Sequence, residues 1–243
     1  MKASRVFLSS CAVVALIGSS EAFAAAAKAA KISPKNNPPI VRTARVPSGD
    51  VLINQQPNAV NGYFNDSDCQ LCGTGQQSMA DNFVINSPTG SALLQHITTW
   101  GGYFPGNTPN ATDSFDILIH NNVGGLPGPT IVFSLSGIQA TSRTMTGVVL
   151  FGVDEWIFEY DLASPPTLPN GTYWLEIFNT TAPTPGVDFF WETGNLDQTN
   201  GIASAAFSFS TPGQGSGWNP NPDDQSMILT GTIPVTLQEF SIE

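Results

Sequence analysis

The chain has 243 residues and a formal net charge of −11 at pH 7, and its charges are divided unevenly. Residues 25–45 carry five bases and no acid, whereas from residue 46 onward Arg143 is the single base against 18 acids. Such a body repels nucleic acid and anionic membranes, so we expect neither as a partner, while cations and neutral sugars suit it.

The amino terminus has the pattern of a secretory signal peptide. Lys2 and Arg5 precede an apolar run over residues 6–18, and Ala22-Phe23-Ala24 supplies a small-x-small cleavage site. The run is shorter than the roughly 20 residues that a membrane span needs. We therefore expect residues 1–24 to be a signal peptide, the mature chain to have no membrane span, and the protein to be secreted, extracellular or periplasmic.

Two regions of different character follow. Residues 25–48 mix Ala, Lys and Pro with little that can pack, which predicts a disordered basic leader. In residues 49–243, Gly and Pro recur about every 8 to 12 residues, with runs rich in Phe, Ile, Val, Thr and Trp between them. This spacing predicts one all-β domain, a two-sheet antiparallel β-sandwich of jelly-roll type.

The mature chain keeps two cysteines, Cys69 and Cys72, in "DCQLCG". In an oxidising compartment, cysteines this close are expected to pair. A redox motif would open a helix, which Gly73-Thr74-Gly75 does not start, and a zinc site would need two further ligands, for which only His96 and His120 are candidates. We predict a Cys69–Cys72 disulfide that acts as a staple.

Two later segments alternate with a period of two, which is typical of strands with one buried and one wet face. In "SFDILIH", residues 114–120, the apolar positions Phe115, Ile117 and Ile119 share a face, which predicts His120 on the solvent side. In "EWIFEYDL", residues 155–162, three acids lie opposite the aromatic face and predict a solvated surface; they are Glu155, Glu159 and Asp161.

"TYWLEIF", residues 172–178, is apolar on both faces. Either it is covered on both sides, or it shows a face with Trp174 and Glu176 to a ligand. The wet strand faces of this chain carry acids and no tryptophan, so we expect Trp174 to be buried and Glu176 to be paired or at an edge.

The sequence contains little evidence of a catalytic site. Ser216 in "GQGSGW" lacks the glycine two positions earlier that a nucleophile elbow needs. A jelly-roll glycoside hydrolase would need two carboxylates across a cleft, one of them in an apolar setting. Glu176, next to Trp174 in its strand face, and Glu192, beside Trp191, suit that environment best, so a glycoside hydrolase stays the enzymatic alternative.

Acidic pairs in loops suggest a metal. Asp66 and Asp68, and likewise Asp223 and Asp224, lie in stretches rich in Gly, Pro and Asn, where Ca²⁺ finds the oxygen ligands that it prefers. Asx turns explain the same residues without an ion. No cofactor is therefore predicted outright, and calcium is the candidate metal if one is bound.

Three aromatic residues are candidates for ligand binding. Trp100 and Tyr103 flank Gly101-Gly102, and Trp218 stands in a stretch rich in Gly, Asn and Pro. We expect these side chains to be exposed, as rings that stack on sugars must be.

Residues 78–232 contain, in order, "SMADNFVI", "ITTWGGYF", "DSFDILIHNNVGGLPGP", "LPNGTYWLEIFN", "FFWET" and "DDQSMILTG". In this order the motifs resemble a module of exported bacterial proteins that often stands ahead of a PEP-CTERM-type sorting tail. The resemblance implies an extracellular β-sandwich of undetermined activity, with no catalytic residues to carry over. The final "GTIPVTLQEFSIE" lacks Pro-Glu-Pro, an apolar span and a basic end, so sorting by that route is not expected.

Together these patterns predict a secreted, non-catalytic β-sandwich that binds a polysaccharide or another cell-surface or matrix component, with carbohydrate as the leading ligand class. The alternatives are the glycoside hydrolase and a purely structural component of an envelope or matrix.

Overall fold

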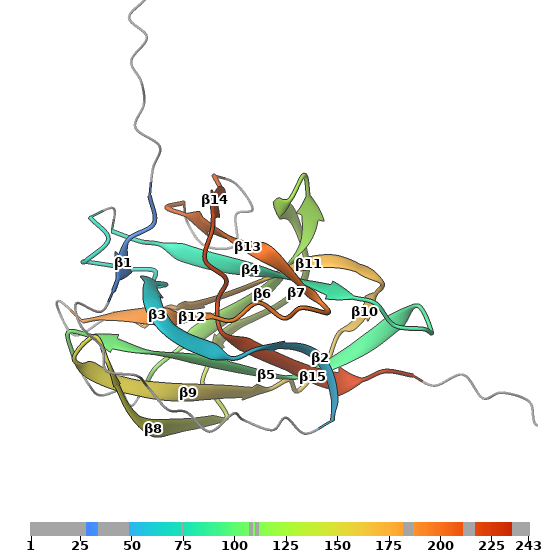
Figure 1. Ribbon diagram of the computed structural model, residues 1–243, viewed down its shortest axis with the longest axis horizontal. Coiled ribbons are helices and arrows are strands. Elements are labelled where there is room, and N and C mark those ends of the chain that lie inside the picture. The colour runs from blue at the N-terminus through green and yellow to red at the C-terminus, as the bar shows by residue number, and fades with distance from the viewer. Residues whose placement is uncertain are drawn as a thin grey trace, which may run out of the picture.

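The computed structural model describes residues 28–33, 49–73, 75–106, 109, 112–181, 187–210 and 217–234. Within these ranges the chain contains strands and no helix, and the strands form two antiparallel sheets that pack against each other (Figure 1). The predicted all-β sandwich is therefore confirmed. The expected signal peptide and most of the leader lie outside the described residues.

The larger sheet, called sheet A, has nine strands in the described part of the chain, and the smaller one, sheet B, has six. Sheet A consists of β1 Lys31–Ile32, β2 Asp50–Gln55, β3 Pro57–Phe64, β5 Ser91–Phe104, β8 Ser142–Leu150, β9 Val153–Asp161, β10 Thr167–Pro169, β12 Asp188–Gly194 and β15 Met227–Thr232. Sheet B consists of β4 Ser78–Ile85, β6 Phe115–Val123, β7 Leu126–Ile138, β11 Gly171–Asn179, β13 Gly201–Ser208 and β14 Asn219–Asn221.

Strand β5 is the centre of sheet A because its 14 residues pair with four other strands. Along one edge of β5, its first part pairs with β15 and its last part with β12. Along the opposite edge, its first residues pair with β10 and the following ones with β9. In sheet B the order is β14-β13-β4-β11-β6-β7, so the late strand β11 lies between two early ones. Such interleaving of early and late strands agrees with the jelly-roll type of connection.

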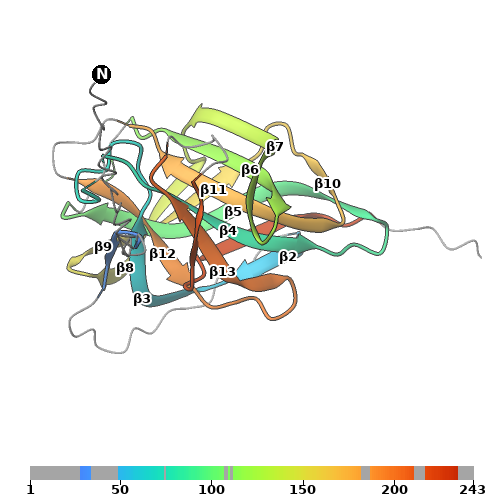
Figure 2. The same ribbon diagram turned by 90° about the horizontal axis from the view of Figure 1, so that it is seen from above.

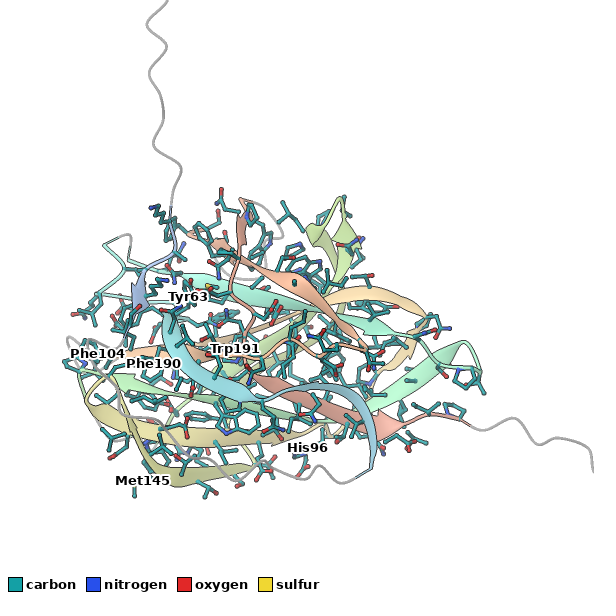
Figure 3. All side chains as sticks on the ribbon, in the orientation of Figure 1. Tyr63, His96, Phe104, Met145, Phe190 and Trp191 are labelled. Carbon is teal, nitrogen blue, oxygen red and sulfur yellow. A yellow bond between two sulfur atoms is a disulfide. The ribbon has the colours of Figure 1, made fainter. Side chains whose placement is uncertain are left out.

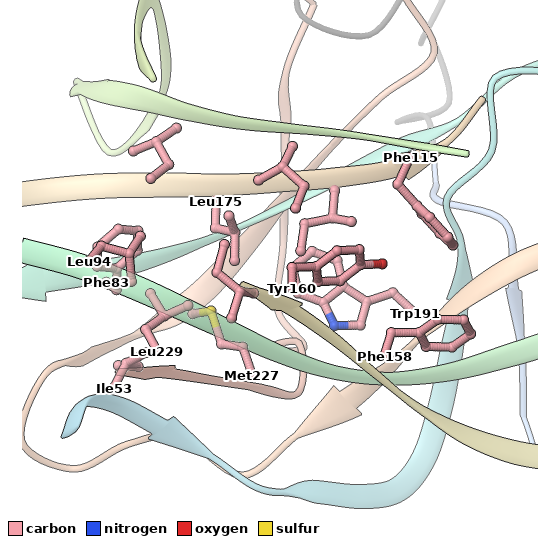
Figure 4. Packing of buried hydrophobic residues seen from close by; sticks show 14 of the residues in the cluster. Ile53, Phe83, Leu94, Phe115, Phe158, Tyr160, Leu175, Trp191, Met227 and Leu229 are labelled. Carbon is pink, nitrogen blue, oxygen red and sulfur yellow. The ribbon is translucent and has the colours of Figure 1, made fainter. Parts of the chain in front are cut away.

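The hydrophobic core lies between the two sheets and is rich in aromatic side chains (Figure 4). Phe115 of β6, Phe158 of β9 and Phe189 of β12 meet edge to face, with ring centroids 5.2 to 5.6 Å apart. Such pairs contribute about 0.5–1.5 kcal/mol each beyond the area that they bury. Contacts between these three strands therefore fasten sheet A to sheet B.

Sheets A and B end in β8 and β7 on the same side of the sandwich, because only residues 139–141 connect these two strands. Figure 2 shows β7 as the outermost ribbon of its sheet. The pairing of β7 with β6 and of β8 with β9 is interrupted by register shifts. Bulges of this kind blunt the edge of a sheet against pairing with further strands.

Part of the expected leader is ordered, which corrects the prediction of a disordered segment over residues 25–48. Lys31 and Ile32 pair with Tyr63 and Gly62 of β3, and the Ala30 N–H donates to the Gln77 side chain at 2.6 Å. The edge of β3 offers backbone partners that composition alone does not reveal. Residues 28–33 therefore belong to the sandwich.

Candidate functional site

The strongest candidate site in the described residues lies on the outer face of sheet B, where ionisable side chains of adjacent strands meet. The register aligns Trp174 of β11 with Asn82 of β4 and His120 of β6, and Glu176 lies one row further along the same face. Ser78 of β4 completes the group, which we call the Ser78–Glu176–His120 cluster. All three of its side chains are fully buried, at 0% exposure.

Glu176 is the centre of this cluster. Its Oε2 lies 2.6 Å from His120 Nε2, and its Oε1 accepts a short hydrogen bond from the Ser78 hydroxyl. His120 Nδ1 lies 3.2 Å from the Gly128 carbonyl oxygen. A carbonyl only accepts, so Nδ1 carries a hydrogen, and one further proton is shared between Nε2 and the carboxylate. Every hydrogen-bonding position of the imidazole is thus occupied.

The order of the groups decides what chemistry the cluster can do. In a hydrolytic triad the imidazole stands between the serine and the carboxylate, so that it can take the serine proton. Here the carboxylate stands between Ser78 and His120, and the serine hydroxyl faces no base other than Glu176. This arrangement holds three strands together and lacks the order of a hydrolytic triad.

Two tryptophans and small neighbours cover the cluster. The Trp218 ring stands edge-on to His120, with centroids 5.9 Å apart, and Trp174 donates its indole N–H to Asn122 at 2.9 Å. Trp174 is 1% exposed and packs with Ala80, Ala206, Leu126 and Trp218. The prediction that Trp174 is buried is confirmed, and of the two expectations for Glu176, paired or at an edge, the structure shows the paired state.

His120 corrects the prediction of a solvent-facing position, because it is buried under Trp218. The period of two in its strand placed it opposite the core correctly, but it carried no information on what covers that second face. The prediction that the acidic face of residues 155–162 is solvated is also wrong for Glu155, which is 0% exposed. Asp161 on the same strand is exposed, as predicted.

Two of the three predicted ligand-binding aromatics are buried, with Trp100 at 3% and Tyr103 at 5% exposure. Their expected exposure is wrong because Gly101-Gly102 is part of β5 and not a loop. A Cβ on Gly101 would lie 2.1 Å from the Phe190 carbonyl oxygen. The two glycines therefore let β12 approach closely, and the aromatic side chains beside them are packed. Figure 3 shows the position of Phe190.

Trp218, the third predicted aromatic, is partly exposed. Its indole nitrogen is buried, and no described residue accepts its hydrogen. Of the three candidates for stacking on a ligand, Trp218 is the one that is partly exposed.

The predicted metal residues Asp66 and Asp68 lie next to the disulfide loop. The Asp66 carboxylate accepts the N–H groups of Asp68 at 2.9 Å and of Phe189 at 3.2 Å. Burial raises the pKa of Asp66 to about 7, and the nearby charge of Asp188 adds to the rise. The carboxylate of Asp66 therefore orders this loop through backbone donors.

Asp223 and Asp224 lie between β14 and β15. Asp223 Oδ2 accepts hydrogen bonds from the Tyr63 hydroxyl at 2.6 Å and from Asn61 at 2.8 Å, and Lys31 Nζ lies 3.6 Å away. Burial raises the pKa of Asp224 to about 6. Among the residues that the structure describes, no three His, Cys, Asp or Glu side chains are grouped so as to hold a metal ion.

The disulfide between Cys69 and Cys72 is formed, as predicted. Cys69 is fully buried against Phe64 and Phe190, whereas Cys72 is partly exposed. Asp188 of β12 accepts the N–H groups of the two residues between the cysteines, Gln70 at 3.1 Å and Leu71 at 2.6 Å.

Sequence reasoning missed one network, which lies between the sheets around Asp81. Its Oδ2 accepts hydrogen bonds from the Gln55 side chain at 2.9 Å and from the Gln225 N–H at 2.5 Å, and its Oδ1 accepts one from the Asn82 N–H. Burial raises the pKa of Asp81 well above its usual range, and the charge of Asp224 adds to this. The available signal was Asp81 itself, a charged residue at a core-facing position of "SMADNFVI".

The two carboxylates best placed for glycoside hydrolysis are both fully buried. Glu176 belongs to the cluster described above, and Glu192 accepts the Ala59 N–H at 2.9 Å. A shallow pocket, open to solvent, lies where β2 begins and β4 ends. Its lining contains no ionisable side chain and includes Val51, Val84 and Asn200.

Comparison of the chain with protein-family models, with curated proteins and with solved structures finds no match. In the described segments, no helix has the length and apolar character needed to cross a bilayer.

Proposed function

We propose that this protein is an exported, non-catalytic β-sandwich that binds a neutral carbohydrate of a cell surface or extracellular matrix. The observation that carries the proposal is that Trp218 is partly exposed while its ring is packed edge-on against the buried His120, with centroids 5.9 Å apart. A fixed aromatic ring offers a flat apolar surface at little cost in conformational entropy.

The surroundings of Trp218 favour an uncharged ligand rich in hydroxyl groups. Asn219 follows it in the chain and is partly exposed, and its side-chain N–H donates to the Gly217 carbonyl oxygen at 3.0 Å. The body of the protein is strongly acidic, which disfavours anionic ligands. The ionisable groups beneath Trp218 are engaged with one another in the Ser78–Glu176–His120 cluster, which supports binding over turnover.

A glycan-array measurement on the purified protein, with and without Ca²⁺, tests this function. We expect binding to a neutral glycan that Trp218→Ala weakens by about tenfold or more, the equivalent of one stacking contact of about 1.4 kcal/mol. Met145→Ala is the matched control, because it removes an apolar side chain that is 52% exposed on the other sheet. Equal binding by the Trp218→Ala variant would contradict the site, and turnover of a polysaccharide would favour the glycoside hydrolase. A requirement for Ca²⁺ would support the predicted metal.

Export and the resemblance to PEP-CTERM-type modules belong to the same proposal. The signal-peptide pattern and the disulfide support export. Amino-terminal sequencing of the exported protein should begin at Ala25, and a protein that keeps residues 1–24 inside the cell would contradict secretion.

A purely structural role is the second candidate, and exposed apolar residues favour it. Residues 117–153 contain no acid, and five large apolar side chains in this range are 37% to 59% exposed; they are Val123, Ile131, Val132, Met145 and Val149. Because the protein is strongly acidic, electrostatic repulsion between two copies is weakest where their contact is made by this acid-free range. Sedimentation velocity at increasing concentration distinguishes the two roles, because a structural component should self-associate and a binding module should stay monomeric.

A further inference from the structure

The disulfide loop has a feature that a staple does not require, a carboxylate placed against one of its sulfur atoms. Asp188 Oδ2 lies 3.6 Å from Cys69 Sγ, and Cys69 is fully buried. A disulfide sulfur has no hydrogen to give, so in the oxidised protein this contact is not a hydrogen bond. A Cys69 thiol at the same place would donate to the carboxylate. The folded protein therefore offers the reduced form an interaction that the oxidised form lacks.

The two cysteines differ in access. Cys72 is partly exposed and is flanked by Leu71, which is 43% exposed, whereas Cys69 lies within the apolar cluster around Phe64 and Phe190. An external thiolate can reach Cys72 and not Cys69. In thiol–disulfide exchange, the attacked sulfur forms the mixed disulfide and the other sulfur leaves.

The backbone of the loop is held independently of the sulfur–sulfur bond. The N–H groups of Gln70 and Leu71 donate to Asp188, and the N–H of Asp68 donates to Asp66. These bonds keep the two cysteines near each other when the disulfide opens, so the bond can form again without refolding.

We propose that Cys69–Cys72 is an exchange-competent disulfide, in which Cys72 is attacked by an external thiol and Asp188 gives the proton to the departing sulfur of Cys69. The thiolate of a dithiol reductant attacks Cys72 Sγ, the bond between the two protein sulfurs breaks, and its electron pair goes to Cys69 Sγ. Cys69 takes the proton of the Asp188 carboxyl group. The second thiol of the reductant then attacks the mixed disulfide, its proton goes to the departing sulfur of Cys72, and the reductant is oxidised to its own disulfide. Both cysteines end as thiols, and the Asp188 carboxylate regains from solvent the proton that the first thiol of the reductant released there on forming its thiolate.

The environment of Asp188 suits this role. Burial raises its pKa, and the charge of Asp68 adds to the rise, so a proton is held there more readily than on an ordinary aspartate. Asp66 and Asp68 are the other acidic groups of the loop, and neither is in hydrogen-bond contact with a sulfur atom. Asp161 is an exposed aspartate of β9 that takes no part in holding the disulfide loop, so Asp161→Asn is a matched control for Asp188→Asn.

The test is reduction of the purified protein by dithiothreitol under native conditions, with thiols trapped by alkylation at intervals and counted by mass spectrometry. We expect the wild type to be reduced without unfolding. Asp188→Asn should slow reduction and lower the reduced fraction at equilibrium by about tenfold, the effect of one hydrogen bond to a charged group. Asp161→Asn should change both quantities by less than about twofold. A wild type that resists millimolar dithiothreitol while folded, or equal effects of the two variants, would overturn the proposal.

A second measurement uses the wild type alone, so it does not depend on the folding of a variant. Brief treatment with reduced glutathione followed by acid quenching traps the mixed disulfide, and peptide mapping identifies the modified cysteine. We expect glutathione on Cys72. Modification of Cys69, or of both cysteines equally, would refute the assignment of attacked and departing sulfur.

Discussion

The two faces of sheet B bury carboxylates in different ways. On the outer face Glu176 is paired with an imidazole, His120, and a serine hydroxyl. On the core face Asp81 meets no base, and neutral N–H groups supply its hydrogen bonds. Asp66 and Asp188 in the disulfide region follow the pattern of Asp81, because backbone N–H groups hold both.

The difference predicts how each carboxylate responds to change. A buried pair loses its compensation when one partner is neutralised, and the remaining group then bears the full cost of burial. When a carboxylate held by neutral donors is replaced, no charged partner is left without compensation. Burial favours the protonated form of such a carboxylate, so its pKa rises. Sheet B therefore contains one network sensitive to substitution and another sensitive to pH.

The largest expected effect is that of Trp174→Ala, which removes the cover of the Glu176 network. The indole is 1% exposed and its N–H is bonded to Asn122, so we expect a loss of about 3 to 5 kcal/mol in the free energy of unfolding. Urea denaturation measures it. Trp218→Ala, at the partly exposed rim, is the control and should cost much less. A stable Trp174→Ala protein that no longer binds its glycan would move the binding site onto this face.

Neutralising Glu176 comes next. Glu176→Gln keeps the size of the side chain but leaves His120 without its carboxylate, and we expect a loss of about 3 kcal/mol by the same measurement. Asp81→Asn is the matched variant on the core face. It should lower the free energy of unfolding by about 1 to 2 kcal/mol, because the neutral donors lose one acceptor and no charged group is left buried without a partner. Equal losses would remove the distinction between the two networks.

The pH dependence tests the carboxylates held by neutral donors, of which Asp66 in the disulfide region is one. The pKa of Asp66 rises to about 7 in the folded protein from an ordinary value of 3.8, so the folded state binds the proton more tightly than the unfolded chain. Its contribution to stability is fully present below the unfolded pKa and is lost as pH rises through the folded pKa. From pH 5 to pH 8 we expect the free energy of unfolding to fall by about 2 to 3 kcal/mol through this group. Thermal or urea unfolding at the two pH values measures the fall.

Asp66→Asn should flatten this dependence, because the variant has no carboxyl group to titrate at this position. An unchanged pH profile in the variant would show that Asp66 titrates normally, and that the burial described here does not govern it.

The smallest of these effects concerns the disulfide. Replacing both Cys69 and Cys72 by Ser should cost about 2 kcal/mol, the chain-entropy value for a closed loop of four residues. The backbone bonds to Asp188 should limit the loss, since they hold the loop without the sulfurs. Denaturation of the double variant measures it, and a loss above about 5 kcal/mol would mean that those bonds fail when the disulfide is absent.

The sequence by itself determined the class of fold, the Cys69–Cys72 bond and the burial of Trp174, and it left Glu176 either paired or at an edge. These depend on local patterns: a period of two, turn residues, cysteine spacing, and the contrast between an apolar face and an acidic one. Such patterns report the environment that a strand needs on each of its own sides.

Only the tertiary structure decided what covers each side. His120 is buried because Trp218, almost 100 residues further along the chain, lies over it, and Trp100 and Tyr103 are buried because Gly101-Gly102 lets β12 approach. The same holds for Asp81, whose donors Gln55 and Gln225 come from opposite ends of the sandwich domain. Coverage arises from contacts between segments distant in sequence, and the period of a single strand contains no information about such contacts.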